Sequence, residues 1–179
     1  MTTSARRLCY QVAASLDGFI AAEDGSYDWI PMDPDIDFPA LFARFDTLVM
    51  GRLTYEVMQA YEGGVGENGV YGKPTIVFSR TLKPADHPNI RVTAEDPAAV
   101  VAALKQQPGG DIWLFGGGNL FRQLADARQV DSVELAVVPV LLGSGIPVVP
   151  KGARLNLSLR SHRIYPGTGT ALLEYDVLK

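Results

Sequence analysis

Three short segments of the sequence combine glycine with side chains that can hold an anion. They are Gly51-Arg52-Leu53-Thr54, Ser79-Arg80-Thr81 and Gly116-Gly117-Gly118-Asn119. Glycine has no Cβ, so backbone N–H groups and a helix N-terminus can approach a pyrophosphate closely. An arginine guanidinium is a planar fork that binds phosphate through two hydrogen bonds. Together the three segments predict a site for a phosphorylated ligand.

Each segment also has a plainer interpretation. A glycine run can be a steric turn without a ligand, and Arg52 or Arg80 alone can be an ordinary solvated charge. The glycine run is not a complete dinucleotide fingerprint, because Phe121 occupies the place of the third glycine. No Gly-Lys-Ser or Gly-Lys-Thr follows it, which excludes a Walker loop. The coincidence of both arginines with Gly51 and the triple glycine favours the anion site.

The type of nucleotide can also be read from the strand ends. The acidic residue that holds an unphosphorylated ribose is missing after the second predicted strand, where Arg52 stands instead. Arg52 and Arg80 could both meet an additional phosphate. The pattern therefore predicts NADP in preference to NAD.

Strand-like runs alternate with helical patterns, which is typical of an α/β protein with a mixed, mostly parallel sheet. We expect strands at 8–14, 47–50, 75–78, 111–115, 133–142, 155–165 and 170–178. We expect helices at 36–45, 52–61, 97–106 and 119–127, an irregular excursion at 15–34, a glycine-rich loop at 63–72 and a hairpin turn at 166–169. The three anion-binding segments follow strands, so parallel packing would bring them to one edge of the sheet.

Composition limits the remaining possibilities. The 179 residues suit a single domain over 1–179, and the formal charge of -4 lacks the basic excess of a nucleic-acid or membrane-surface binder. Cys9 is the lone cysteine and there are two histidines, so neither a disulfide framework nor a Cys/His zinc site can form. This composition fits a reducing cytosol, and we expect a cytoplasmic protein.

A calcium site can be rejected on its spacing. Residues 33–37 imitate the first half of a calcium loop, with aspartate at every second position. The sixth position is Phe38 and the twelfth is Arg44, where the loop needs glycine and glutamate. We therefore expect no bound metal.

Five short segments stand out in order along the chain: 15–21 (SLDGFIA), 50–56 (MGRLTYE), 78–81 (FSRT), 116–120 (GGGNL) and 138–145 (VPVLLGSG). Together they resemble the dihydrofolate-reductase-like superfamily, and most closely the branch that contains the reductase domain of bacterial riboflavin biosynthesis. The resemblance spans nearly the whole chain and implies a three-layer dihydrofolate-reductase-like fold with an antiparallel C-terminal hairpin.

The resemblance also implies roles for individual residues in binding NADPH. The backbone of Ala13 would hold the nicotinamide carboxamide, and Ile20 would pack near the ring. Arg52 and Thr54 would bind the cofactor phosphates, beside Gly51. Ser79 and Arg80 would hold the adenosine 2′-phosphate. The pyrophosphate would lie on Gly117, Gly118, Asn119 and Leu120.

The implied reaction is hydride transfer from NADPH to an electron-poor C=N or C=O of a small heterocyclic or carbonyl substrate, like that of 5-amino-6-(5-phosphoribosylamino)uracil reductase. Trp29 would exclude water, and Asp35 is the leading proton source, with Asp33 and Asp37 close by. Asp17 is expected to be structural. The sequence does not name the substrate.

Two alternatives remain. Dihydrofolate reduction is disfavoured because no Lys or Arg lies between Arg52 and Lys73, and because Ala136 and Val138 stand where a substrate-side hydroxyl is expected. The other alternative is a non-catalytic NADP(H)-binding or regulatory protein that lacks a productive substrate pocket.

Two expectations concern larger pieces of the molecule. Residues 18–33 contain Gly18 and Gly25 with little regular periodicity, so we expect a lid that orders when the cofactor binds. Residues 135–142 and the final strand are rich in apolar and β-branched side chains, which predicts a homodimer formed through this region.

Overall fold

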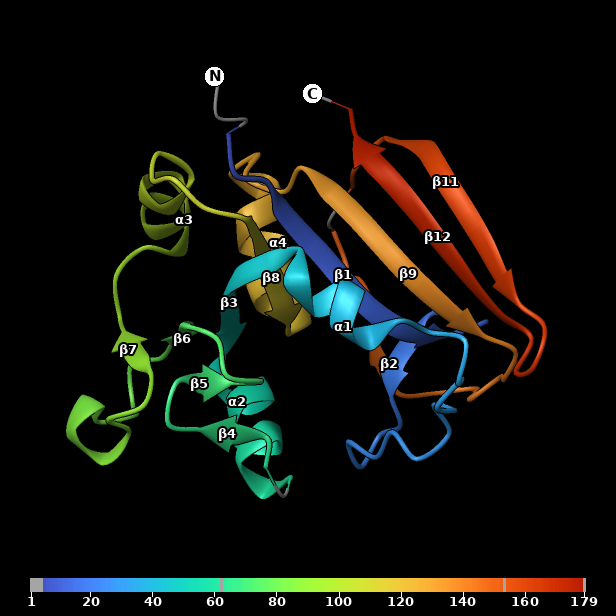
Figure 1. The fold of residues 1–179 in the computed structure, drawn as a ribbon, viewed down its shortest axis with the longest axis horizontal. Helices are drawn as coiled ribbons and strands as arrows, with labels where there is room; N and C mark the ends of the chain where they lie inside the picture. Colours follow the sequence, from blue (N-terminus) through green and yellow to red (C-terminus); the bar gives the residue numbers. More distant parts are fainter. Residues whose placement is uncertain (1–4, 62, 153, 179) are drawn as a thin grey trace.

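A computed structural model describes residues 5–61, 63–152 and 154–178. These residues form a central eight-stranded sheet in the order β11-β12-β9-β1-β8-β3-β6-β7 (Figure 1). The six strands from β9 to β7 are parallel, and β12 and β11 are added antiparallel at the other edge. The expected mixed, mostly parallel α/β fold is therefore confirmed. The strands are β1 (Leu8–Ser15), β3 (Phe45–Gly51), β6 (Thr75–Phe78), β7 (Arg91–Thr93), β8 (Asp111–Gly116), β9 (Ser132–Val138), β11 (Leu157–Tyr165) and β12 (Thr170–Val177).

Helices connect the parallel strands, as crossover connections require. Asp37 and Asp96 cap the N-termini of α1 and α3, each by accepting a hydrogen bond from a first-turn amide. Proline in the first turn suits both starts. The helices are α1 (Phe38–Ala43), α2 (Arg52–Ala60), α3 (Pro97–Lys105), α4 (Gly118–Asp126) and the short 3-10 turn η1 (Pro84–Asp86).

Alternating side chains of the strands build a core on each side of the sheet. On the first face, Leu8 and Tyr10 of β1 pack with α3 and α4, and the Tyr10 ring lies 4.3 Å from that of Phe121. On the second face, Cys9 and Met50 lie in a core that includes residues of α2. Burial raises the pKa of the Cys9 thiol, so this cysteine is an inert part of the core.

The structure differs from the predicted elements at several places, among them the following four. Phe45, expected at the end of a helix, begins β3 and is buried under Trp113. The irregular excursion contains β2 (Phe19–Ala21), which pairs with β10 (Ile146–Pro147). The glycine-rich loop contains a hairpin of β4 (Val65–Gly66) and β5 (Gly69–Val70). Strand β9 ends at Val138, because Pro139 cannot continue the ladder.

An ionic cluster covers part of the second face. Glu134 of β9 is 1% exposed, and its carboxylate accepts hydrogen bonds from Arg44 at 2.6 Å and Arg160 at 2.9 Å. Arg44 is the C-cap residue of α1, and the bond to Glu134 raises its pKa. The Arg44–Glu134 ion pair holds the C-terminal end of α1 against the sheet.

Candidate functional site

The three predicted anion-binding segments lie at one edge of the sheet. Gly51 at the end of β3 is in register with Phe78 at the end of β6. Met50 is in register with Gly116 at the end of β8. The segments that begin at Arg52, Ser79 and Gly117 therefore leave three adjacent parallel strands at the same edge.

Two helices begin at this edge without a side-chain cap. The N-cap residues of α2 and α4 are Gly51 and Gly117, and neither helix has a capping hydrogen bond or an acidic residue in its first turn. Helices α1 and α3, by contrast, are both capped by aspartate. Uncapped first-turn amides and the positive end of the helix dipole favour an anion. The edge thus presents two open N-termini side by side.

The floor between these helices is made of glycine and threonine. A Cβ placed on Gly117 would lie 3.4 Å from Thr54 Oγ1, and one on Gly116 would lie 3.5 Å from the same atom. A Cβ on Gly118 would meet the Pro150 ring at 3.3 Å. The Gly116–Gly117 peptide bond is cis. Side chains larger than hydrogen would fill the space through which a pyrophosphate reaches the amides.

Asn119 and Leu120, the next predicted residues, differ in exposure. The side chain of Asn119 is exposed at the start of α4, whereas Leu120 is buried in the first-face core. Leu120 can therefore contribute only its backbone amide to a ligand. That amide donates to the Gly117 carbonyl at 3.0 Å, which aligns the first turn.

The edge also carries Arg52, Ser79 and Arg80, which differ in their hydrogen bonds and exposure. The Nη1 atom of Arg52 donates to both carboxylate oxygens of Glu56, at 2.6 and 2.8 Å, and the other guanidinium nitrogens have no partner among the described residues. The Ser79 hydroxyl accepts from the amides of Thr81 and Leu82 at 3.1 and 3.0 Å. Ser79 therefore shapes the turn that carries Arg80. The Arg80 side chain is exposed.

Ala13 lies where a backbone could hold a carboxamide. The Arg7 carbonyl accepts from Ile112 of β8, and the Leu8 carbonyl accepts from Asp131 on the other side. Because strand backbone groups alternate in direction, those of Ala13 point the same way as those of Arg7. The register of β1 with β8 ends at Tyr10 and Leu114. Ala13 thus faces the space beyond β8, next to Gly116. Ile20, in β2, packs against the first-face core.

The middle of the sheet is partly uncovered on the second face. In the central strand β1, residues 8–10 and 14–15 are buried, but residues 11–13 are half-buried. Residues 135–137 of β9 beside them are half-buried too. Parallel sheets are usually covered on both faces, so this accessible area marks a candidate substrate surface. On the second face it contains Gln11, Ala13 and Ala136.

Aromatic rings border this accessible area, which sequence reasoning missed. Phe42 of α1 stacks on Tyr71 with centroids 5.0 Å apart, and Tyr71 and Phe115 form a T-shaped pair with centroids 5.9 Å apart. Phe115 belongs to β8 and follows Leu114, the register partner of Tyr10, so it lies beside Gln11. The one sequence signal was the polar Gln11 within an apolar strand.

The predicted lid is attached at both ends. At its start, the Asp17 carboxylate accepts from the amides of Leu142 and Gly143, and it also accepts from Ser15. These bonds lower the pKa of Asp17. At its end, Asp33 is 2% exposed and accepts from Thr168 in the β11–β12 turn at 2.7 Å. The pKa of Asp33 is lowered, chiefly by that bond.

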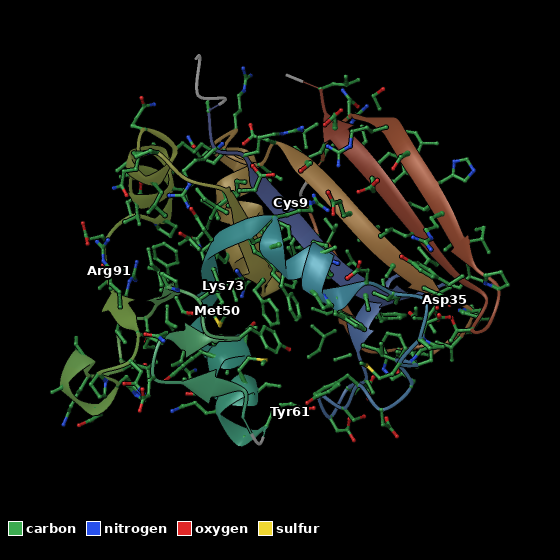
Figure 2. All side chains as sticks on the ribbon, viewed as in Figure 1. Cys9, Asp35, Met50, Tyr61, Lys73 and Arg91 are labelled. Atoms are coloured by element: carbon green, nitrogen blue, oxygen red, sulfur yellow. The ribbon has the colours of Figure 1, made fainter. Side chains whose placement is uncertain are left out.

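The two predicted catalytic residues lie in the lid and just beyond it. Trp29 is half-buried, and its Nε1 is a buried side-chain donor without a hydrogen-bond partner in the described residues. Asp35 is exposed, and Figure 2 shows it on the side where the β11–β12 hairpin turns. Asp33 is the buried aspartate of this segment, and Asp37 caps α1. Asp37 is exposed as Asp35 is, but one of its carboxylate oxygens accepts from the Ala40 amide at 2.9 Å.

Two other features are absent from the described ranges 5–61, 63–152 and 154–178. No group of three or more His, Cys, Asp or Glu side chains is arranged to hold a metal ion among them. Nor does any helix in these ranges have the length and apolar character needed to cross a membrane.

The fold and this edge define an α/β protein of dihydrofolate-reductase-like fold. The chain belongs to the RibD C-terminal domain family, whose model matches residues 6–171. The relative YyaP of Bacillus subtilis, an uncharacterized protein, is 34% identical in an alignment of 169 residues that covers 89% of this chain and 89% of YyaP.

Three solved structures share the fold. A Shewanella protein assigned to riboflavin biosynthesis has a TM-score of 0.76 at 23% identity, over 98% of this chain and 100% of that one. The deaminase/5-amino-6-(5-phosphoribosylamino)uracil reductase of Thermotoga maritima has a TM-score of 0.70 at 15% identity, over 97% of this chain and 57% of that one. Dihydrofolate reductase of Enterococcus faecalis, complexed with NADP(H), has a TM-score of 0.68 at 17% identity, over 97% of each chain.

Proposed function

We propose that this protein is an NADPH-dependent reductase that transfers hydride to a small, electron-poor heterocyclic or carbonyl substrate. The observation that carries the proposal is the pair of uncapped helix N-termini at Gly51 and Gly117 on one sheet edge, with Thr54 between them. The Thermotoga neighbour, a uracil reductase, and the Enterococcus neighbour, a dihydrofolate reductase complexed with NADP(H), agree with it.

The residues present fit a dinucleotide with an extra phosphate. The amides of Gly118 and Asn119 would hold the pyrophosphate, with Thr54 and Arg52 on the opposite side, while the Leu120 amide stays bound to the Gly117 carbonyl. Arg80 would meet the 2′-phosphate from the turn that Ser79 shapes. When bound, the nicotinamide supplies a hydride. Ala13 would orient its carboxamide beyond the end of β8, and Ile20 would pack near the ring.

The lid would complete the reaction site. Trp29 would exclude water from the reacting atoms, because its indole is held in a segment attached at Asp17 and Asp33. Asp35 would supply the proton that accompanies the hydride, directly or through water.

The test is NADPH oxidation followed at 340 nm over pterins, ribosylaminopyrimidines and small carbonyl compounds. The proposal expects oxidation with at least one of these classes and its loss in Gly117→Val, where the added side chain would meet Thr54. Tight NADPH binding without oxidation over all three classes would instead support a non-catalytic NADP(H)-binding protein.

We also propose that the protein is a homodimer formed through the first face of β9, β12 and β11. Leu159 and Ile164 on this face are 53% and 55% exposed, and the charged side chains of these strands lie on the second face. In Figure 1 the β11–β12 hairpin extends beyond the helices. A second copy presents the same apolar surface, so a two-fold arrangement would cover both.

A further inference from the structure

His162 is a histidine of β11, the strand at one edge of the sheet (Figure 1). Register partners on neighbouring strands share a face of the sheet. The register places His162 beside Leu173 of β12, and Leu173 beside Leu135 of β9. Leu135 packs against the first-face core. His162 therefore stands on the first face, through which the homodimer is proposed.

The neighbours of His162 on this face are apolar. Along β11, Leu159 precedes it across a β-bulge and Ile164 follows it by two residues, and all three side chains are exposed. Tyr175, the register partner of Leu159, is the one other titratable side chain that the described parts of β9, β11 and β12 place on this face. A tyrosine is uncharged at and below neutral pH. His162 is thus the group that can bring a charge to this apolar surface.

The charged side chains of β11 and β12 lie on the other face of the sheet. They are Arg160, Arg163, Glu174 and Asp176. Arg160 is ion-paired with both of these acids, at 3.6 Å and 3.3 Å. In the described parts of β9, β11 and β12, therefore, no carboxylate shares the first face with His162 and could compensate a positive charge there.

A proton on His162 would change the cost of burying this face. In a two-fold arrangement the opposing surface is a copy of the same surface, so it offers no carboxylate from these strands either. A neutral imidazole can be buried with one hydrogen bond, whereas an unpaired charge is expensive to bury. Histidine is the side chain that ordinarily changes charge between about pH 5 and 8.

We infer that His162 makes the proposed homodimer sensitive to pH, because a protonated imidazole favours the separate protomers. The inference rests on the proposed homodimer and adds a regulation of it. The separate protomer exposes His162 and holds a proton more readily than the dimer does, so acidification shifts the equilibrium toward the monomer. The loss of net charge toward the isoelectric point of about 5.1 acts in the opposite direction, since it promotes association.

The test is sedimentation equilibrium at about pH 7.5 and about pH 5.5 and constant ionic strength, which gives the dissociation constant of the dimer. The wild-type constant should be at least about tenfold larger at the lower pH. His162→Gln, which is neutral at both pH values, should change less than about threefold between them. His162→Arg should already weaken the dimer at the higher pH. His87→Gln replaces the other histidine of the chain and should keep the wild-type pH dependence.

The possible failures are separable. Wild-type constants that agree at the two pH values, or a pH dependence that persists in His162→Gln, overturn the inference and leave the homodimer standing. A His162→Arg dimer as tight as wild type at the higher pH also overturns it, without any exposure to acid. Wild-type protein that is monomeric at both pH values overturns the inference together with the homodimer. None of these readouts depends on NADPH, so a failure of the reductase assignment is recognised independently.

Discussion

At the scale of single residues, Arg52 gives a direct test of whether the sheet edge at Gly51 and Gly117 binds the cofactor phosphates. Arg91 makes the same type of i,i+4 pair with Glu95, but on β7 and the loop after it. We expect Arg52→Ala to weaken NADPH binding about tenfold, near 1.4 kcal/mol, because a charged hydrogen bond to phosphate is lost. Arg91→Ala should leave the affinity unchanged. Equal effects of the two substitutions in a calorimetric titration would show that Arg52 does not contact the cofactor.

Asp33 gives a pH-dependent prediction. Its pKa in the folded protein is lowered by the Thr168 bond, so its contribution to stability is present above the unfolded pKa and is lost as pH falls through the folded value. Asp33→Ala should therefore lower the melting temperature at pH 7 more than below about pH 3, given an ordinary aspartate pKa of about 3.9. Asp35→Ala, at an exposed side chain, is the control. A melting-temperature difference that does not vary with pH would contradict the assigned role of the carboxylate.

At the scale of elements, the anchors of the lid limit where it can move. Its start is fixed by Asp17 and by the β2–β10 pairing, and its end by Asp33. We expect hydrogen exchange to slow on NADPH binding in residues 22–32, while β1 changes little. Exchange in residues 22–32 that is already slow without NADPH, and is unchanged by it, would indicate a rigid loop.

The order of the elements could be predicted from the sequence, because apolar periodicity marks each long strand and helix. The three anion-binding segments could be placed on one edge for the same reason, since each follows a parallel strand. The short pairs β2–β10 and β4–β5 could not be predicted, because their two- and three-residue strands carry no periodicity and depend on distant partners. The accessible area around Gln11 could not be predicted either, because it depends on the order of the strands, which places β1 between β9 and β8.

At the scale of the whole molecule, the uncovered first face of β11 and β12 predicts the assembly. A charge at Leu159 or Ile164 should separate the proposed dimer, because it would be buried without a partner. We expect light scattering to give a dimer mass for wild-type protein and 19.3 kDa for Ile164→Arg. Ser158→Arg, at an exposed position of the same strand, is the control for the added charge. Wild-type protein that stays at 19.3 kDa across a hundredfold concentration range would contradict the dimer.

The central claim is that the sheet edge at Gly51 and Gly117 holds NADPH, and calorimetric titration with NADPH and NADH tests it most directly. The exposed Arg80, at the proposed 2′-phosphate position, predicts that NADPH binds at least about tenfold more tightly than NADH. It also predicts that Arg80→Ala removes most of this preference while NADH affinity stays the same. No heat of binding with either cofactor, or equal affinities in wild-type protein, would contradict the account.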